Sequence, residues 1–139
     1  MNPRGNDDRF TTLRDGKRDI IWEHDHVATW KDMEKLLKTN KTKAIGVCNY
    51  SIPYLEKLLA HADVIPAVNQ IKNHSGLTQQ SVVDFFKSRG IHIMAYSPLG
   101  SSGGPLMRDE KVRQLAEEKN VSPSTILLSY AGELIPRPH

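Results

Sequence analysis

The stretch Ala44-Ile45-Gly46-Val47-Cys48-Asn49 decides the fold class, because it is a short apolar run without polar residues at alternate positions. A run of this kind favours a strand that is buried on both faces. Two comparable runs follow at 66–71 and 91–96. We therefore predict a strand buried on both faces at 44–49 and two further strands at 66–71 and 91–96, and each of the three ends in polar side chains.

Helical patterns fill the gaps around these strands. Apolar residues recur at helical spacing in 29–40, behind Thr29 as a predicted N-cap. A second helix is predicted from Ser51 and Pro53, which suit the first turn of a helix, and a third around 82–86 with Gly90 as its stop. Two more helices are predicted beyond the loop at 97–104, marked by the apolar residues Val112, Leu115, Ala116, Ile126, Leu127 and Tyr130.

The strands begin about 22 to 25 residues apart with a helix in each gap, which is the rhythm of parallel βαβ units. The predicted class is α/β. A doubly wound open sheet and a (β/α)8 barrel both have this rhythm, so the spacing alone leaves the two open. A barrel needs eight strands and about 250 residues, so these 139 residues would form only part of one.

Composition limits the kinds of function. With 38% hydrophobic and 25% charged residues the chain is typical of a globular domain, and the opening residues hold no apolar stretch of the signal-peptide type. We expect a cytoplasmic protein without a membrane span, which the single cysteine, Cys48, also fits. The net charge of +3 comes from basic residues interleaved with acidic ones, so we expect no nucleic-acid partner. The predicted division is an extended loop at 1–28, the main domain at 29–130 and an atypical tail at 131–139.

Polar side chains gather where the three strands end. The first strand ends in Cys48-Asn49, the second in Asn69-Gln70 and the third in Tyr96-Ser97. Amides carry paired donors and acceptors and a tyrosine ring offers a stacking face, so a flat ligand with its own amide would suit this edge. Alternatively, these side chains only satisfy backbone groups at the strand ends. The residues leave both readings open.

Other candidate sites give weaker signals. The loop at 98–104 could wrap a phosphate through backbone amides, but it has no P-loop lysine and no G-x-G-x-x-G precedes it, so a surface loop is the stronger reading. His74 is predicted to be structural. His24 and His26 flank Asp25 without a third ligand at a helpful spacing, and we predict a solvated loop there and no metal.

Four segments resemble the aldo-keto reductase family, in order and at the right spacing. They are T-W-K-D-M-E-K-L at 29–36, A-I-G-V-C-N-Y at 44–50, A-V-N-Q at 67–70 and Y-S-P-L-G-S at 96–101. The resemblance implies a (β/α)8 barrel, with the strands above as about the fifth to the seventh. It also implies NADPH as cofactor, NADP-dependent oxidoreductase activity, and carbonyl substrates that are aldehydes or ketones.

The resemblance implies roles for individual residues. Cys48, Asn49 and Gln70 would meet the nicotinamide carboxamide and Tyr96 would stack on its ring. The pyrophosphate would lie along the turn of Ser97, Pro98, Leu99, Gly100 and Ser101. Two departures stand out: a cysteine replaces the family's serine at 48, and Lys72-Asn73-His74-Ser75 stands where relatives often have E-x-H-P.

The family's catalytic aspartate, tyrosine, lysine and histidine lie before the matching segments, so no catalytic residue is assigned here and we expect the chain to be inactive alone. At the other end, Ile135-Pro136-Arg137 either echoes the family's I-P-K or belongs to an unrelated tail. Part of a barrel also leaves sheet edges unpaired, which predicts marginal stability or self-association. The alternative function is a non-catalytic binding module.

Overall fold

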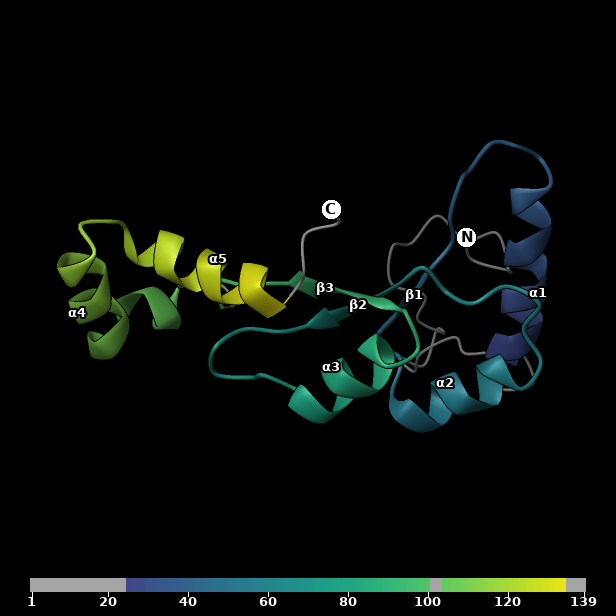
Figure 1. The fold of residues 1–139 in the computed structure, drawn as a ribbon, viewed down its shortest axis with the longest axis horizontal. Coiled ribbons are helices and arrows are strands. Elements are labelled where there is room, and N and C mark those ends of the chain that lie inside the picture. Colours follow the sequence, from purple (N-terminus) through teal and green to yellow (C-terminus); the bar gives the residue numbers. More distant parts are fainter. Residues whose placement is uncertain (1–24, 101–103, 135–139) are drawn as a thin grey trace, which may run out of the picture.

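The computed structural model describes residues 25–100 and 104–134. Three strands and their helices follow one another along this part of the chain, and α4 and α5 form an arm at the end of the molecule opposite α1 (Figure 1). The elements are α1 (His26–Leu37), β1 (Val47–Cys48), α2 (Ile52–Leu59), β2 (Val68–Lys72), α3 (Gln80–Lys87), β3 (His92–Tyr96), the 3-10 helix η1 (Pro105–Arg108), α4 (Glu110–Glu118) and α5 (Pro123–Leu134). None of the described helices is long and apolar enough to cross a membrane.

The sheet has the order β1-β2-β3, and both pairings are parallel. Val47 lies opposite Asn69, and Asn69 lies opposite Ile93. The predicted parallel α/β arrangement is confirmed. β1 is shorter than the predicted run because only Val47 and Cys48 pair in the ladder, although Ala67 N–H still donates to the Ile45 carbonyl (2.9 Å).

The prediction that the strand at 44–49 is buried on both faces is wrong, and the other strands of the sheet alternate in the same way. Along β3, Ile93 is buried, whereas its neighbours His92 and Met94 are exposed. β1 shows the same change from buried Val47 to exposed Cys48. The physical reason is that three strands make an open sheet, and α2 and α3 pack on only one of its faces (Figure 1).

One hydrophobic core lies between these helices, α1 and the sheet. Ridges of leucine from α2 and of valine and phenylalanine from α3 reach it, as the apolar spacing of both helices predicts. Its buried members are Trp30, Ile45, Val47, Leu55, Leu58, Ile71, Val83, Phe86, Ile91 and Ile93.

α1 begins earlier than predicted. Its N-cap is Asp25, whose carboxylate accepts a hydrogen bond from Val27 N–H at 3.1 Å, so Thr29 is inside the helix. Aspartate is among the best N-cap residues because its oxygen satisfies an N–H group that has no partner within the helix. Residues 26–28 are therefore helical, and the predicted solvated loop is wrong at His26; His24 lies outside the described residues.

The predicted residues stand at the helix ends near the sheet, although one of them makes no capping hydrogen bond. Ser51 stands at the N-cap of α2 as predicted, but its hydroxyl makes no capping hydrogen bond. Beyond α3, Gly90 has φ +71°, a left-handed conformation that glycine adopts without steric cost, and its N–H donates to the Lys87 carbonyl. This turn delivers the chain to β3.

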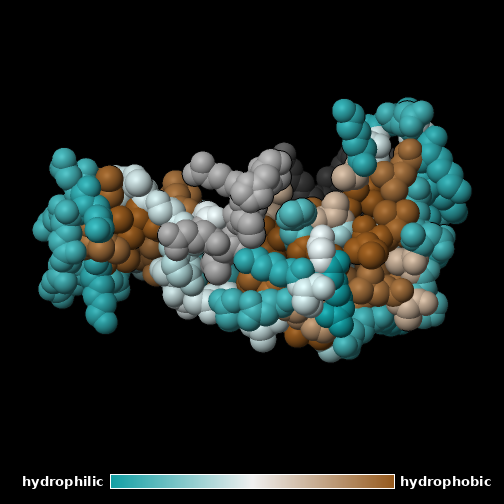
Figure 2. Space-filling model, in the orientation of Figure 1, coloured by the Kyte–Doolittle hydropathy of each residue, from teal (hydrophilic) through white to brown (hydrophobic). Residues whose placement is uncertain are grey.

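The arm consists of η1, α4 and α5, which contact one another. Asp109 caps α4 by accepting from the N–H groups of Lys111 and Val112. Ala116, Leu127 and Ala131 are buried between the helices, and the outer surface of α4 is hydrophilic (Figure 2). Both predicted C-terminal helices are confirmed, and η1 was not predicted. α5 continues to Leu134, so the segment from 131 begins as helix; 135–139 lie outside the described residues.

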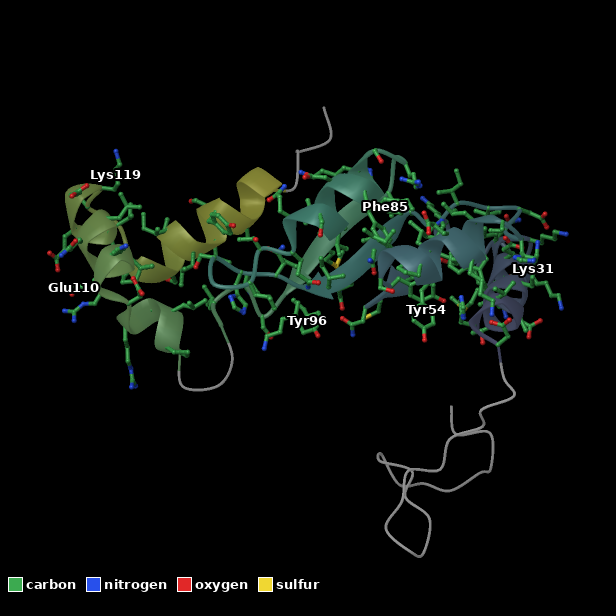
Figure 3. All side chains as sticks on the ribbon, turned by 90° about the horizontal axis from the view of Figure 1, so that it is seen from below. Lys31, Tyr54, Phe85, Tyr96, Glu110 and Lys119 are labelled. Atoms are coloured by element: carbon green, nitrogen blue, oxygen red, sulfur yellow. The ribbon has the colours of Figure 1, made fainter. Side chains whose placement is uncertain are left out.

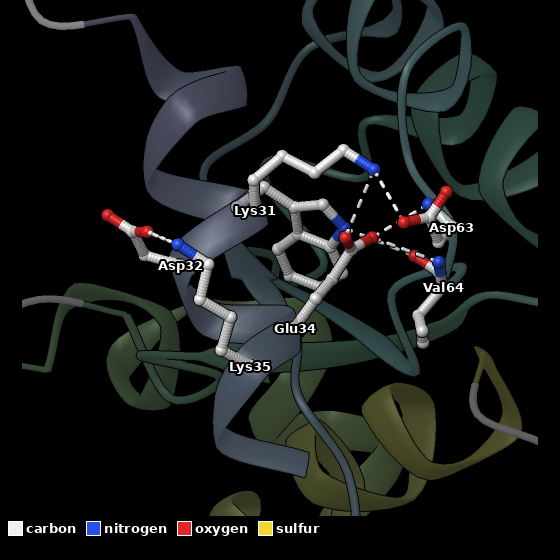
Figure 4. Close-up of polar contacts among 7 residues, drawn as sticks. Lys31, Asp32, Glu34, Lys35, Asp63 and Val64 are labelled. Atoms are coloured by element: carbon white, nitrogen blue, oxygen red, sulfur yellow. Dashed lines mark hydrogen bonds and ion pairs between the residues drawn. The ribbon is translucent and has the colours of Figure 1, made fainter. Parts of the chain in front are cut away.

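A buried carboxylate ties α1 to the segment that leads into β2 (Figure 4). Glu34 is 8% exposed, and its Oε1 accepts from the backbone N–H groups of Asp63 (2.8 Å) and Val64 (2.9 Å). Lys31 Nζ lies 3.2 Å from Glu34 Oε2, and Trp30 Nε1 donates to the Val64 carbonyl. Burial disfavours the charged carboxylate, but these hydrogen bonds and Lys31 outweigh it and hold the pKa of Glu34 below its ordinary value of 4.5.

This network predicts a loss of stability in acid. Because the folded-state pKa of Glu34 is depressed, its contribution is present above pH 4.5 and disappears as the pH falls through the folded-state pKa. We expect Glu34→Gln to lower the Tm at pH 7 and to close the gap to the wild type in acid. Thermal melts followed by circular dichroism between pH 7 and pH 3 measure this, with Glu56→Gln on the exposed side of α2 as control. A gap that stays constant down to pH 3 would contradict it.

Candidate functional site

Three side chains from three strands stand in one row on the open face of the sheet. Cys48 lies opposite Gln70, and Gln70 lies opposite Met94. Neighbouring residues in a parallel ladder point to the same face, and this face is the one away from α2 and α3. Cys48 is exposed, Gln70 is half-buried and Met94 is 47% exposed, so the row is accessible.

Tyr96 stands on the same face, one step farther along. It lies opposite Lys72, and both are half-buried. A strand advances about 3.3 Å per residue and neighbouring strands lie about 4.8 Å apart, which puts the Cα atoms of Gln70 and Tyr96 about 8 Å apart. One flat ligand can therefore touch both. Figure 3 shows Tyr96 at the end of β3 that leads to the arm.

Asn49 ends β1 and turns the chain away from the sheet. Its N–H still donates to the Gln70 carbonyl at 2.9 Å, but its φ is +57°, in the left-handed region. Asparagine tolerates that region better than most residues. Asn49 is exposed, and it follows Cys48 directly in the chain. Cys48, Asn49, Gln70 and Tyr96 are called the rim below.

The rim offers amide groups with spare hydrogen-bonding capacity. Gln70 Nε2 donates to Met94 Sδ (2.9 Å), a weak acceptor that a better one can replace. A thiol at Cys48 is a poorer partner than a hydroxyl. The two amides and the Tyr96 ring are therefore the groups that best fit a ligand with a carboxamide on a flat ring.

The turn after β3 is tight. Ser97 has φ +53° and Gly100 φ +88°, and Gly100 N–H donates to the Ser97 carbonyl at 2.9 Å. A Cβ at Gly100 would lie 3.3 Å from Leu106 Cγ, so glycine allows η1 to pack on the turn. Residues 97–100 are half-buried, and Ser101 lies outside the described residues. Whether the turn holds a phosphate stays a prediction.

The sequence placed Asn69 at the end of the second strand but predicted no function for it. It is fully buried on the opposite face from Gln70, between Val47 and Ile93. Its Oδ1 accepts from Tyr50 N–H (3.3 Å), and its Nδ2 donates to the Tyr50 carbonyl (3.0 Å). An amide inside an apolar strand pattern was the signal in the sequence, and period-two alternation would have separated it from Gln70.

The loop after β2 is held by a similar set of contacts. Asn73 is 1% exposed, and its Nδ2 donates to the Thr78 carbonyl at 2.6 Å. Gln79 Nε2 donates to the Lys72 carbonyl at 2.6 Å. His74 and Leu77 exchange two backbone hydrogen bonds, so His74 belongs to a closed turn, in line with a structural part in this loop.

An aromatic cluster packs beside the rim at the start of α2. The ring of His26 lies 5.5 Å from that of Tyr50 and 5.0 Å from that of Tyr54, edge to face. Asp25 contacts both His26 Nδ1 (3.1 Å) and Lys57 Nζ (2.9 Å). Burial, followed by the nearby Asp25 charge, raises the pKa of Tyr50 above its ordinary value.

Two cavities of the described chain lie away from the rim. One of about 480 Å³ is lined by residues of the Glu34 network, and one of about 380 Å³ lies between α4, α5 and Ser75. Residues 25–100 and 104–134 contain no cluster of three or more histidine, cysteine or acidic side chains that could hold a metal. Neither of these two cavities is lined by a residue of the rim.

Sequence comparisons show which family of proteins this chain is similar to. A family model described as "Aldo/keto reductase family" matches residues 19–134. The chain is 64% identical over 130 residues to D-galacturonate reductase of Hypocrea jecorina, which covers 94% of this chain and 42% of that protein.

Solved structures give the same likeness. Aldose reductase from Giardia lamblia matches with a TM-score of 0.83 at 32% identity, covering 90% of this chain and 42% of that one. An aldo-keto reductase from Bombyx mori, solved in complex with NADP, matches with a TM-score of 0.74 at 30% identity, covering 93% and 44%. The chain thus spans about two fifths of the length of each of these proteins. Of the two architectures left open by strand spacing, the likeness selects part of a (β/α)8 barrel.

Proposed function

This chain belongs to the aldo/keto reductase family, and we propose that it forms the nicotinamide-holding part of an NADP-dependent reductase that converts aldehydes or ketones to alcohols. The observation that carries the proposal is the rim: the side chains of Gln70 and Tyr96 stand on one accessible face of the sheet, and the exposed Asn49 follows directly at the end of β1. Its cytoplasmic location is part of the same proposal.

The rim fits a nicotinamide in its chemistry. A carboxamide has an acceptor oxygen and a donor NH2 group, and the side chains of Asn49 and Gln70 can complement both. The Tyr96 ring would stack on the pyridine ring. The backbone of the turn formed by Ser97, Pro98, Leu99, Gly100 and Ser101 would line the pyrophosphate. When bound, the cofactor supplies the hydride that reduces the carbonyl carbon.

We also propose that the chain alone does not reduce carbonyls, because the pKa of Tyr50 is shifted away from the value that an acid catalyst needs. A general acid works best with a pKa near the operating pH. The pKa of Tyr50 is raised, and its ring packs against His26 and Tyr54. The proton donor would come from a part of the family fold that these 139 residues do not supply.

The residues that select the substrate lie in other parts of the family fold. Two relatives with names that specify different substrates, D-galacturonate and aldose, share this segment with the chain. A segment that stays alike while the substrate changes fits cofactor binding better than substrate selection. We therefore assign no substrate beyond a carbonyl compound.

A titration with NADPH tests the cofactor part. We expect saturable binding, followed by the fluorescence of the reduced nicotinamide, that Gln70→Ala weakens about tenfold through the loss of one hydrogen-bonding amide. Gln80→Ala on the exposed side of α3 is the matched control and should leave binding unchanged. Equal affinity of the wild type and Gln70→Ala for NADPH would contradict the assignment of the rim as the nicotinamide site.

Carbonyl-dependent oxidation of NADPH tests the proposal that the chain alone is inactive. With a panel of aldehydes we expect no oxidation of NADPH above the background measured without protein. Turnover by the purified chain would overturn the proposal that it is inactive alone.

A second candidate is a binding module that pairs through its sheet. β1 and β3 are the edges of the described sheet, and Met94 is exposed on its open face. Unpaired edges and exposed apolar side chains favour pairing with another chain. Sedimentation velocity over a range of concentrations distinguishes a self-associating chain from a monomer.

A further inference from the structure

We infer that Asn69 is a positioning residue for the rim: its buried side-chain amide clamps the backbone of Tyr50 and so fixes the turn that presents Asn49. The clamp itself is a statement about this fold. Its consequence for the cofactor rests on the function proposed above.

The clamp replaces a step of the β1–β2 ladder. The ladder pairs Cys48 with Gln70 and ends with the hydrogen bond from Asn49 N–H to the Gln70 carbonyl. The chain then leaves the sheet through the left-handed conformation of Asn49, so Tyr50 does not continue the ladder. The Asn69 side chain reaches both the N–H and the carbonyl of Tyr50, at 3.3 and 3.0 Å.

Only asparagine, of the side chains of this size, makes both contacts. A primary amide has the same donor and acceptor as a peptide group. Aspartate at 69 could accept from Tyr50 N–H but could not donate to the carbonyl, and leucine could do neither. Because Asn69 is fully buried, water cannot readily take its place there.

The clamp matters for Asn49 because a left-handed backbone is unfavourable for a residue with a side chain. Surroundings must hold such a residue in place. On one side Asn49 is held by its bond to Gln70, and on the other by the clamp on Tyr50. Without the clamp, the backbone that carries the Asn49 side chain is held only by its bond to the Gln70 carbonyl.

The same strand face offers a matched control. Asn73 is also an asparagine, is also buried, and also holds a loop through its Nδ2, which donates to Thr78. Its loop leads to α3 and contains no residue of the rim. Substitutions at 69 and 73 thus remove similar buried amides with different consequences for Asn49.

The first measurement needs no ligand. Hydrogen exchange of Asn69→Leu should show protection of the Tyr50 amide reduced about tenfold or more relative to the wild type, as for the loss of one buried hydrogen bond. Asn73→Leu should leave this amide unchanged. Should Asn69→Leu fail to fold, Asn69→Ala, which removes both the donor and the acceptor with a smaller side chain, takes its place. Protection of Tyr50 that is unchanged by the substitution at 69, or lost equally by that at 73, overturns the clamp.

The second measurement tests the consequence for the ligand. NADPH is compared with its 3-acetylpyridine analogue, in which a methyl group replaces the NH2 of the carboxamide. We expect the wild type to prefer NADPH, Asn69→Leu to reduce that preference severalfold, and Asn73→Leu to keep it. An unaltered preference in folded Asn69→Leu overturns the positioning role. If the wild type binds neither nucleotide, the proposed function fails while hydrogen exchange still decides on the clamp.

Discussion

Replacing Gly46 with alanine is expected to destabilise this chain severely or to abolish its cooperative folding. A Cβ at Gly46 would collide with the side chain of Val68 and would lie 2.7 Å from the Val68 carbonyl oxygen. That oxygen belongs to the backbone of β2 and cannot turn aside, so β1 would have to move away from β2. Overpacking of this kind costs about 1–3 kcal/mol, occasionally more, and here it also breaks the short β1 pairing.

Gly132 in α5 provides the comparison. A Cβ there meets nothing within 4 Å, and alanine is favoured over glycine inside a helix by about 1 kcal/mol. In urea titrations followed by circular dichroism we expect Gly132→Ala to unfold at the same or a higher midpoint than the wild type. Gly46→Ala should show a much lower midpoint or no transition. Similar midpoints for the two variants would refute the close approach of β1 and β2.

The second large effect is expected at Phe86. This side chain is fully buried in the core among residues of α2, α3 and the sheet. Truncation to alanine leaves a cavity, and such changes typically cost about 3–5 kcal/mol. In a small chain this is a large share of the total stability, so the urea midpoint should fall steeply or the transition should vanish.

Phe85 is the matched control, one residue away on the same helix. It is half-buried, and the Arg89 guanidinium carbon lies 3.5 Å from its ring centroid. Phe85→Ala loses this stacking and some apolar contact, for which we expect about 1 kcal/mol. If Phe85→Ala and Phe86→Ala lower the free energy of unfolding by the same amount, the core does not lie where the structure places it.

The order of elements was predictable because each signal was local. Leu55 and Leu58 recur at helical spacing, and both are buried in α2. Gly90 marks the turn between α3 and β3 through a positive φ that other residues adopt with difficulty. Parallel pairing followed from the helix in each gap, since parallel strands need a crossover.

The wrong predictions concern features that depend on contacts between distant parts of the chain. The apolar run at 44–49 predicted burial on both faces, yet Cys48 is exposed, because burial depends on what packs on the sheet and not on the strand itself. The start of α1 was placed at Thr29, although Asp25 caps it and also contacts Lys57 of α2. That contact joins residues 32 positions apart and leaves no local pattern.

The cofactor role of the candidate site residues stays a prediction, and their arrangement could not be predicted from the sequence. Gln70 and Tyr96 were named from strand ends, and the ladder brings them to one face. Asn69 was adjacent to Gln70 in the sequence, but its opposite face and its pairing with Tyr50 depend on the register with β1. The register between two strands is a tertiary property, and it cannot be read from a single sequence.

Cys48 has a practical consequence for experiments on this protein. It is the only cysteine among the 139 residues, it is exposed, and it lies in the ladder directly opposite Gln70. A maleimide or a nitroxide reagent therefore has one site of attachment, without any engineered substitution. The rate of alkylation there reports on access to the open face of the sheet, and a fluorophore attached to the thiol would sense anything that settles on it.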